Sequence, residues 1–90
     1  MANLKGFGKE YYNKKLLFEG QYSNGERNGK GKEYDYDGKL IFEGEYKNGE
    51  KWNGKEKEYF DNGKIKFEGE YLNGKRNGKG KEYDYLNNII

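Results

Sequence analysis

The chain has 90 residues, enough for one small domain, and 38% of them are charged although the net charge is only +2. Only 31% are hydrophobic and 18% are aromatic, so tyrosine and phenylalanine must supply most of the buried surface. The absence of cysteine and histidine excludes disulfides, thiolate metal sites and His-dependent nucleophilic triads. No stretch has the apolar length of a signal peptide or a membrane span, so we expect a cytoplasmic protein.

Seven strand-length segments follow one another along the chain, separated by turn residues. We expect strands at about 6–12, 16–22, 29–36, 39–46, 54–61, 64–71 and 78–86. Segments of about seven or eight residues are typical of strands and too short for most helices. We expect three loop residues in the first turn, Asn13-Lys14-Lys15, and two-residue type I′ turns at Asp37-Gly38 and Asn62-Gly63.

The segments repeat. Phe-Glu-Gly-x-Tyr starts at Phe18, Phe42 and Phe67, which are 24 and 25 residues apart, and Gly-Lys-x-Lys-Glu-Tyr spans 29–34, 54–59 and 78–83 with a partial copy at 6–11. Asn-Gly pairs stand between these strings, at 24–25, 48–49 and 73–74. A two-residue turn at Asp37-Gly38 would place Glu33 opposite Phe42 and Tyr34 opposite Ile41.

The alternation predicts a sheet with one aromatic face and one face of Lys–Glu pairs. The expected core consists of Phe18, Tyr22, Leu40, Phe42, Tyr46, Ile65, Phe67 and Tyr71. Glycines between two aromatics, such as Gly44, let neighbouring rings lie across the backbone. The central unit differs from the others: it has one extra residue and the only tryptophan, Trp52, so we expect a bulge or wider turn at 50–53, and Glu56 replaces a glycine.

Phe-Glu-Gly-Glu-Tyr-x-Asn-Gly followed by Gly-Lys-Gly resembles the MORN (membrane occupation and recognition nexus) repeat, in a variant with a 24–25 residue period. The second aromatic is tyrosine here, where the family's motif often has tryptophan. The resemblance implies an elongated sheet of successive hairpins used for scaffolding, dimerisation and, in some members, membrane association. We therefore predict one all-β domain over 1–90, a single-layer antiparallel meander of tandem β-hairpins, with units at about 6–25, 29–49, 54–74 and 78–86.

Catalysis is not expected. Glu33, Glu58 and Glu82 occupy one repeat position, whereas an active site is usually a single constellation. A one-layer sheet also offers little of the desolvated pocket that shifts a pKa. Asp35, Asp37 and Gly38 resemble part of a calcium loop, but the remaining ligands are lacking and turn chemistry explains them. We expect no metal and no cofactor.

The predicted function is a protein-interaction scaffold that self-associates as a homodimer through its edge strands, with burial of the Ile89-Ile90 pair. The first alternative is that the protein binds anionic phospholipid and is peripheral to a membrane. The second alternative is that it binds a glycan or cell-wall ligand. Nucleic acid is disfavoured, because the glutamates opposite the lysines neutralise them. The predicted interaction surface consists of Tyr34, Tyr36, Trp52, Tyr59, Tyr83, Tyr85, Lys30, Lys32, Lys55, Lys57, Lys79 and Lys81.

Overall fold

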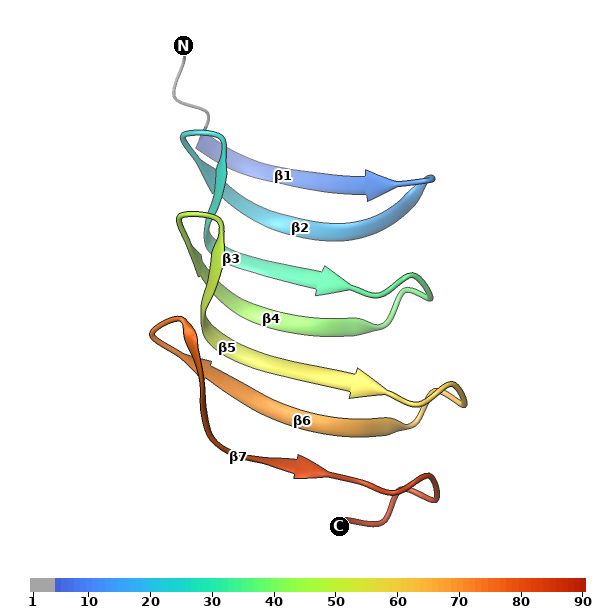
Figure 1. Ribbon diagram of the computed structural model, residues 1–90. Coiled ribbons are helices and arrows are strands. Elements are labelled where there is room, and N and C mark those ends of the chain that lie inside the picture. The colour runs from blue at the N-terminus through green and yellow to red at the C-terminus, as the bar shows by residue number, and fades with distance from the viewer. Residues whose placement is uncertain (1–4) are drawn as a thin grey trace.

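The computed structural model describes the chain from residue 5 to residue 90, except for the side chain of Lys79. Seven strands form one antiparallel sheet in sequence order, as predicted, and the molecule measures 50 × 32 × 12 Å (Figure 1). No helix in this part of the chain is long and apolar enough to cross a membrane. The strands are β1 (Lys5–Tyr12), β2 (Lys15–Ser23), β3 (Glu26–Tyr34), β4 (Leu40–Lys47), β5 (Glu50–Tyr59), β6 (Ile65–Leu72) and β7 (Lys75–Glu82).

The Asn-Gly pairs form the tight turns at one end of the strands, on the left of Figure 1. Both residues have positive φ in each pair, for example 54° at Asn24 and 79° at Gly25, as a type I′ turn requires. Pairing therefore resumes directly after each turn. The predicted starts of three strands were three or four residues too late, since β3, β5 and β7 begin at Glu26, Glu50 and Lys75.

The turns at the other end differ from the prediction. At Asp37-Gly38 only Gly38 has positive φ, and the Asp35 N–H donates to the Lys39 carbonyl, so the loop has three residues and is not type I′. The cause is Asp35, whose Oδ1 accepts the N–H groups of Asp37 and Lys39 at 2.9 Å. The turn interpretation of this acidic pair is thus confirmed.

The same correction applies at Asn62-Gly63, where the Phe60 N–H donates to the Lys64 carbonyl around another three-residue loop. The first turn errs in the opposite direction. It has two residues, because Asn13 and Lys14 both have positive φ and Tyr12 pairs with Lys15.

A bulge beside each of these turns restores the expected register. Pairing skips Ile41, so Tyr34 lies opposite Leu40 and the predicted Tyr34–Ile41 pair is wrong. Beyond the bulge Glu33 lies opposite Phe42, as predicted, because the extra loop residue and the bulge offset each other. Equivalent bulges occur at residues 17 and 66.

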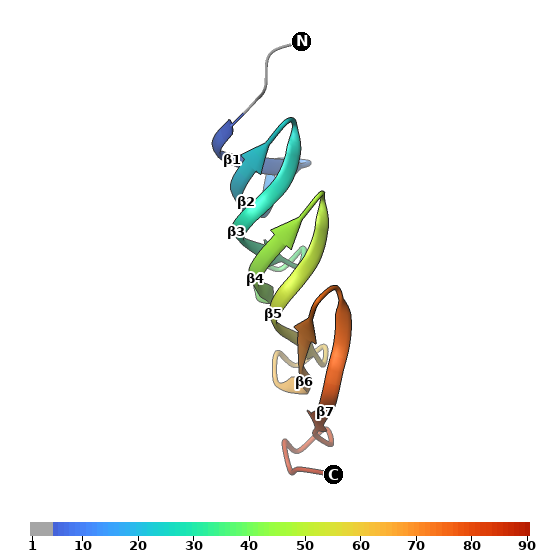
Figure 2. The same cartoon turned by 90° about the vertical axis from the view of Figure 1, so that its left-hand side faces the viewer.

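The core lies where the sheet bends. β3, β5 and β7 turn sharply after their first residues, and the three tight-turn ends stack one below another (Figures 1 and 2). This bend brings the Arg27 guanidinium to 4.1 Å from the centroid of the Phe18 ring, which is fully buried. A Cβ at Gly31 would lie 2.7 Å from that ring, so only glycine fits beneath it.

Burial is narrower than the predicted core. Phe18, Phe42 and Tyr46 are buried, and Tyr22 and Tyr71 pack against them while partly exposed. Leu40, Ile65 and Phe67 are also only partly buried. The third aromatic unit is therefore the most open.

The inserted tryptophan changes the register of the central hairpin. The bulge expected at 50–53 is present, because pairing between β4 and β5 skips Trp52. In the β2–β3 hairpin Phe18 lies opposite Glu33, and in the β6–β7 hairpin Phe67 lies opposite Glu82. In the central β4–β5 hairpin Phe42 lies opposite Glu56, two residues before Glu58, which is the equivalent glutamate. At about 3.4 Å per residue, this shift of two residues offsets the third unit from the first two by about 7 Å along the strands.

Candidate functional site

The face opposite the aromatic rings is a lattice of alternating charges. Lys9, Glu19, Lys32, Glu43 and Lys55 lie opposite one another in succession from β1 to β5. Their signs alternate, which favours the sheet and leaves little net field, although only Lys32 and Glu43 come as close as 3.9 Å. Lys30, Lys32, Lys55 and Lys81 are exposed and Lys57 is partly so; the side chain of Lys79 lies outside the described residues.

A groove of about 550 Å³ crosses this face. Its floor is the backbone of Gly20, Gly31 and Gly44, which lie opposite one another on β2, β3 and β4. Its walls carry both signs of charge, and its end at β1 is apolar. The lining side chains are Phe7, Glu19, Lys30, Lys32, Glu43 and Glu45.

Three of the predicted tyrosines direct their hydroxyls back into the sheet. The Tyr34 hydroxyl donates to Glu19 at 2.5 Å, and the Tyr83 hydroxyl donates to Glu68 at 2.9 Å. Tyr59 donates to the Leu40 carbonyl at 2.7 Å. The hydrogen bond to Glu19, followed by burial, raises the pKa of Tyr34 to about 12. Because these hydroxyls are hydrogen-bonded within the sheet, the part of each tyrosine that a ligand could contact is mainly the ring.

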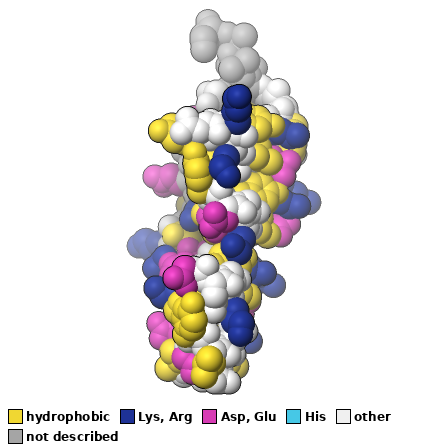
Figure 3. All heavy atoms as spheres, turned by 90° about the vertical axis from the view of Figure 1, so that its right-hand side faces the viewer, with side chains coloured by type: hydrophobic (Ala, Val, Ile, Leu, Met, Phe, Trp, Pro, Cys, Tyr) yellow, Lys and Arg dark blue, Asp and Glu magenta, His cyan; other side chains and the backbone are white. Residues whose placement is uncertain are grey.

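Two other predicted tyrosines lie at the hairpin loops. Tyr36 lies 6.4 Å from the Tyr12 ring, with Lys15 Nζ 5.0 Å from its centroid. Tyr85 lies 5.2 Å from the Phe60 ring. Figure 3 views this edge, where hydrophobic and basic side chains are interspersed with acidic ones. Sequence reasoning missed both partner rings, although each follows a Lys-Glu-Tyr string directly.

Trp52 lies at the opposite end of the strands, among the tight turns. Lys47 Nζ lies 4.5 Å from its ring, and the Gly74 N–H donates to its carbonyl at 2.9 Å. A Cβ at Gly74 would lie 3.1 Å from the ring, so the indole rests on the next turn. The structure thus separates the predicted interaction surface into a charged face, a loop edge and this indole.

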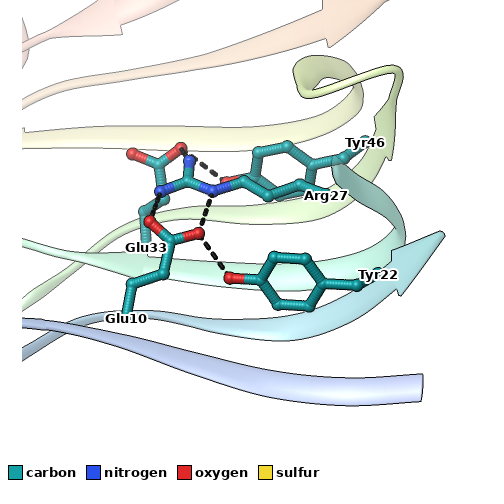
Figure 4. A network of polar contacts seen from close by, with 5 residues as sticks. All are labelled: Glu10, Tyr22, Arg27, Glu33 and Tyr46. Atoms are coloured by element: carbon teal, nitrogen blue, oxygen red, sulfur yellow. Dashed lines mark hydrogen bonds and ion pairs between the residues drawn. The ribbon is translucent and has the colours of Figure 1, made fainter. Parts of the chain in front are cut away.

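A polar network that the sequence did not reveal joins the first four strands (Figure 4). Arg27 contacts Glu10 through two nitrogens, at 2.7 Å and 2.9 Å, and Glu33 through a third at 3.1 Å. Tyr22 donates to Glu10, and Tyr46 donates to Glu33 at 2.6 Å. The only clue was that both arginines of the chain occupy the same repeat position.

The network fixes the protonation states of its members. Hydrogen bonding to Arg27 holds the pKa of Glu10 below its usual range. Burial, followed by the hydrogen bond to Glu10, raises the pKa of Tyr22 to about 12, and burial raises that of Tyr46 as well. A carboxylate that is held ionised and tyrosines that are held protonated suit a structural role better than proton transfer.

The equivalent arginine in the last hairpin is more open. Arg76 is 62% exposed, and its Nε lies 2.7 Å from Oε1 of Glu56, whose side chain is 6% exposed. That oxygen accepts no aligned hydrogen bond from the described residues, so the contact is an ion pair. Within the described residues, His, Cys, Asp and Glu side chains form no group of three that could hold a metal ion.

Comparison with protein families agrees with this repeat geometry. The model of the MORN repeat matches residues 18–39, 42–52 and 67–85, and the model of the MORN repeat variant matches residues 52–73. Together these segments cover most of the chain from β2 onward. No curated protein and no solved structure gave a match.

Proposed function

This chain belongs to the MORN repeat family, and from that membership we propose that it is a non-catalytic cytoplasmic scaffold that binds protein, including a second copy of itself. The family is in general a non-enzymatic repeat scaffold, and MORN repeats occur in proteins that bind protein or membrane. The thin sheet also supports a binding role, because both of its broad faces are open to a partner. At 50 Å by 32 Å, either face exceeds the roughly 800 Å² per partner of a standard interface.

Self-association is supported by three exposed aliphatic residues that follow β7. Leu86, Ile89 and Ile90 are 74%, 69% and 77% exposed. Their backbone is ordered against the sheet, since Tyr83 bridges to Ile89 and the Ile90 N–H donates to the Glu82 carbonyl. Exposed aliphatic side chains on a segment that is hydrogen-bonded to the sheet favour a surface that a partner covers. A second copy that packs against these residues about a twofold axis would cover them, and the assembly would close after two chains.

Size-exclusion chromatography with light scattering tests this proposal. We expect a dimer mass, and we expect Ile89→Ser with Ile90→Ser to shift the protein to a monomer while its circular dichroism is unchanged. Phe7→Ser is the matched control, because Phe7 is a comparably exposed apolar residue at the opposite edge. A monomer at high concentration, with the same mass in both variants, would overturn the self-association.

Binding to anionic membranes is a second candidate, and the loop edge favours it. There Tyr12 and Tyr36 are exposed beside Lys15, and Lys66 Nζ lies 5.9 Å from the Phe60 centroid. Aromatic and basic side chains together suit the interface of an anionic bilayer. Co-sedimentation with phosphatidylserine vesicles, reversed by salt and weakened by Tyr36→Ser, would support this role. Equal sedimentation with neutral vesicles would contradict it.

A further inference from the structure

The outer edge of β1 has no partner strand among the described residues. Residues 6–11 of β1 are a partial copy of residues 29–34 of β3, so that Gly8, Lys9 and Glu10 stand where β3 has residues 31–33. β3 pairs on both sides with strands that carry Phe-Glu-Gly-x-Tyr, namely β2 and β4. β1 has such a neighbour on one side only, β2. Its free edge therefore presents one half of a pairing that the sheet completes elsewhere.

The free edge also leaves an aromatic site half filled. The atoms nearest to a Cβ at Gly31 would belong to two rings, Phe18 at 2.7 Å and Tyr46 at 2.9 Å. The atoms nearest to a Cβ at Gly8 would all belong to Tyr22, the closest at 2.7 Å. Tyr22 thus repeats the role of Tyr46. The phenylalanine that β2 supplies over Gly31 has no counterpart in the environment of Gly8.

The accessibility of the two sites agrees with this comparison. The side chain of Glu10 is 42% exposed, against 20% for Glu33, its equivalent in the completed site. Tyr22 is partly exposed, whereas Tyr46 is buried. Phe7, which also lies on β1, is exposed. A partner strand at this edge would cover all three groups.

We propose that the outer edge of β1 binds an extended segment of another polypeptide with the pattern Phe-Glu-Gly-x-Tyr, added antiparallel as a further strand. The register follows from β2 and β3: the incoming phenylalanine lies opposite Glu10, the glutamate opposite Lys9 and the glycine opposite Gly8. The phenylalanine meets the Tyr22 ring edge-on, as Phe18 meets Tyr46 with centroids 5.1 Å apart. Backbone hydrogen bonds supply affinity, and the ring supplies specificity.

A second folded copy of the chain does not supply this segment. Its three strands with the pattern are β2, β4 and β6, and each already pairs on both sides. Two β1 strands side by side would bring no phenylalanine to either Gly8. The partner is therefore a chain whose Phe-Glu-Gly-x-Tyr segment is unpaired. This inference rests on the protein-binding role proposed above and specifies what the outer edge of β1 recognises.

The test is titration of the full-length protein with a synthetic peptide of residues 14–23, followed by NMR and calorimetry. We expect saturable binding, together with protection from hydrogen exchange for the β1 amides that point away from β2. The Phe18→Ala peptide is the matched control and should bind at least tenfold more weakly. Equal binding of the two peptides, no binding, or protection at β7 in place of β1 would overturn the proposal.

A charge exchange separates specific pairing from general stickiness. The Lys9→Glu protein should bind the original peptide severalfold more weakly and should recover binding with a Glu19→Lys peptide. Binding that is indifferent to both changes would contradict the register. The peptide test is also independent of the dimer. If the protein dimerises but does not bind the peptide, only this inference is overturned. If a monomeric protein binds the peptide, only the proposed self-association is overturned.

Discussion

Replacement of Phe42 by alanine should lower the free energy of unfolding by about 3–5 kcal/mol. Phe42 is 1% exposed, and its ring meets Tyr46 and Tyr71 edge-on at centroid distances of 5.4 Å and 5.7 Å. Lys51 Nζ lies 5.1 Å from the same centroid. Because rings and backbone enclose the side chain, its truncation leaves a cavity that the sheet cannot easily close. A chain of this length has roughly 5–13 kcal/mol in total, so the loss is large.

Phe67→Ala is the matched control, because Phe67 holds the same repeat position but is only partly buried. Its nearest cation is also farther away, with the Arg76 guanidinium 5.9 Å from the ring centroid. We expect a loss of about 1–2 kcal/mol for this variant. Urea unfolding followed by circular dichroism gives both values. Equal losses would show that the position in the repeat, and not the observed burial, determines the cost, and our account of the core would be refuted.

Three further predictions follow from the polar groups and the bulge. Arg76→Ala should lower the free energy of unfolding by about 1–3 kcal/mol, because it leaves the Glu56 carboxylate buried without its cation, and a further Glu56→Gln should recover part of the loss in urea unfolding. The pKa of Tyr22 lies above its unfolded value of 10.0, so the contribution of Tyr22 to the free energy of unfolding is fully present below pH 10. That contribution is lost as the pH rises through about 12. Denaturant midpoints that stay constant over that range would contradict this. Deletion of Trp52 should re-pair Phe42 two residues further along β5, and cross-strand NOEs that stay unchanged would show that the insertion does not cause the offset.

Strand number, order and faces could be predicted because they depend on local alternation that each unit repeats. The turns could not be assigned from dipeptides alone. Asp35 accepts hydrogen bonds from two backbone amides, and this favours a three-residue loop over the type I′ turn that Asp-Gly usually indicates. The error stayed local, because the bulge at Ile41 returns the strands to the expected pairing.

The offset of the third unit was beyond prediction for a different reason. A shift of two residues keeps every side chain on its original face, so the pattern of polar and apolar residues fits both registers equally well. The Arg27 network was missed because it depends on the bend of β3, which brings a residue next to a turn over Phe18. Of the candidate site, the sequence predicted the residue types on the charged face but not their division among three separate surfaces.

The two-residue shift in register between β4 and β5 interrupts the alignment of equivalent repeat positions across the strands. Phe18 and Phe42 lie in one row across the strands, whereas the row through Phe42 reaches Gly69 on β6, two residues away from Phe67. A rigid ligand that crosses the strands with uniform spacing can match the rows on one side of the step only. A ligand that contacts equivalent repeat positions on both sides of the step must shift by about 7 Å along the strand direction. The single inserted residue therefore divides the sheet into two regions, each with its own alignment of repeat positions across the strands.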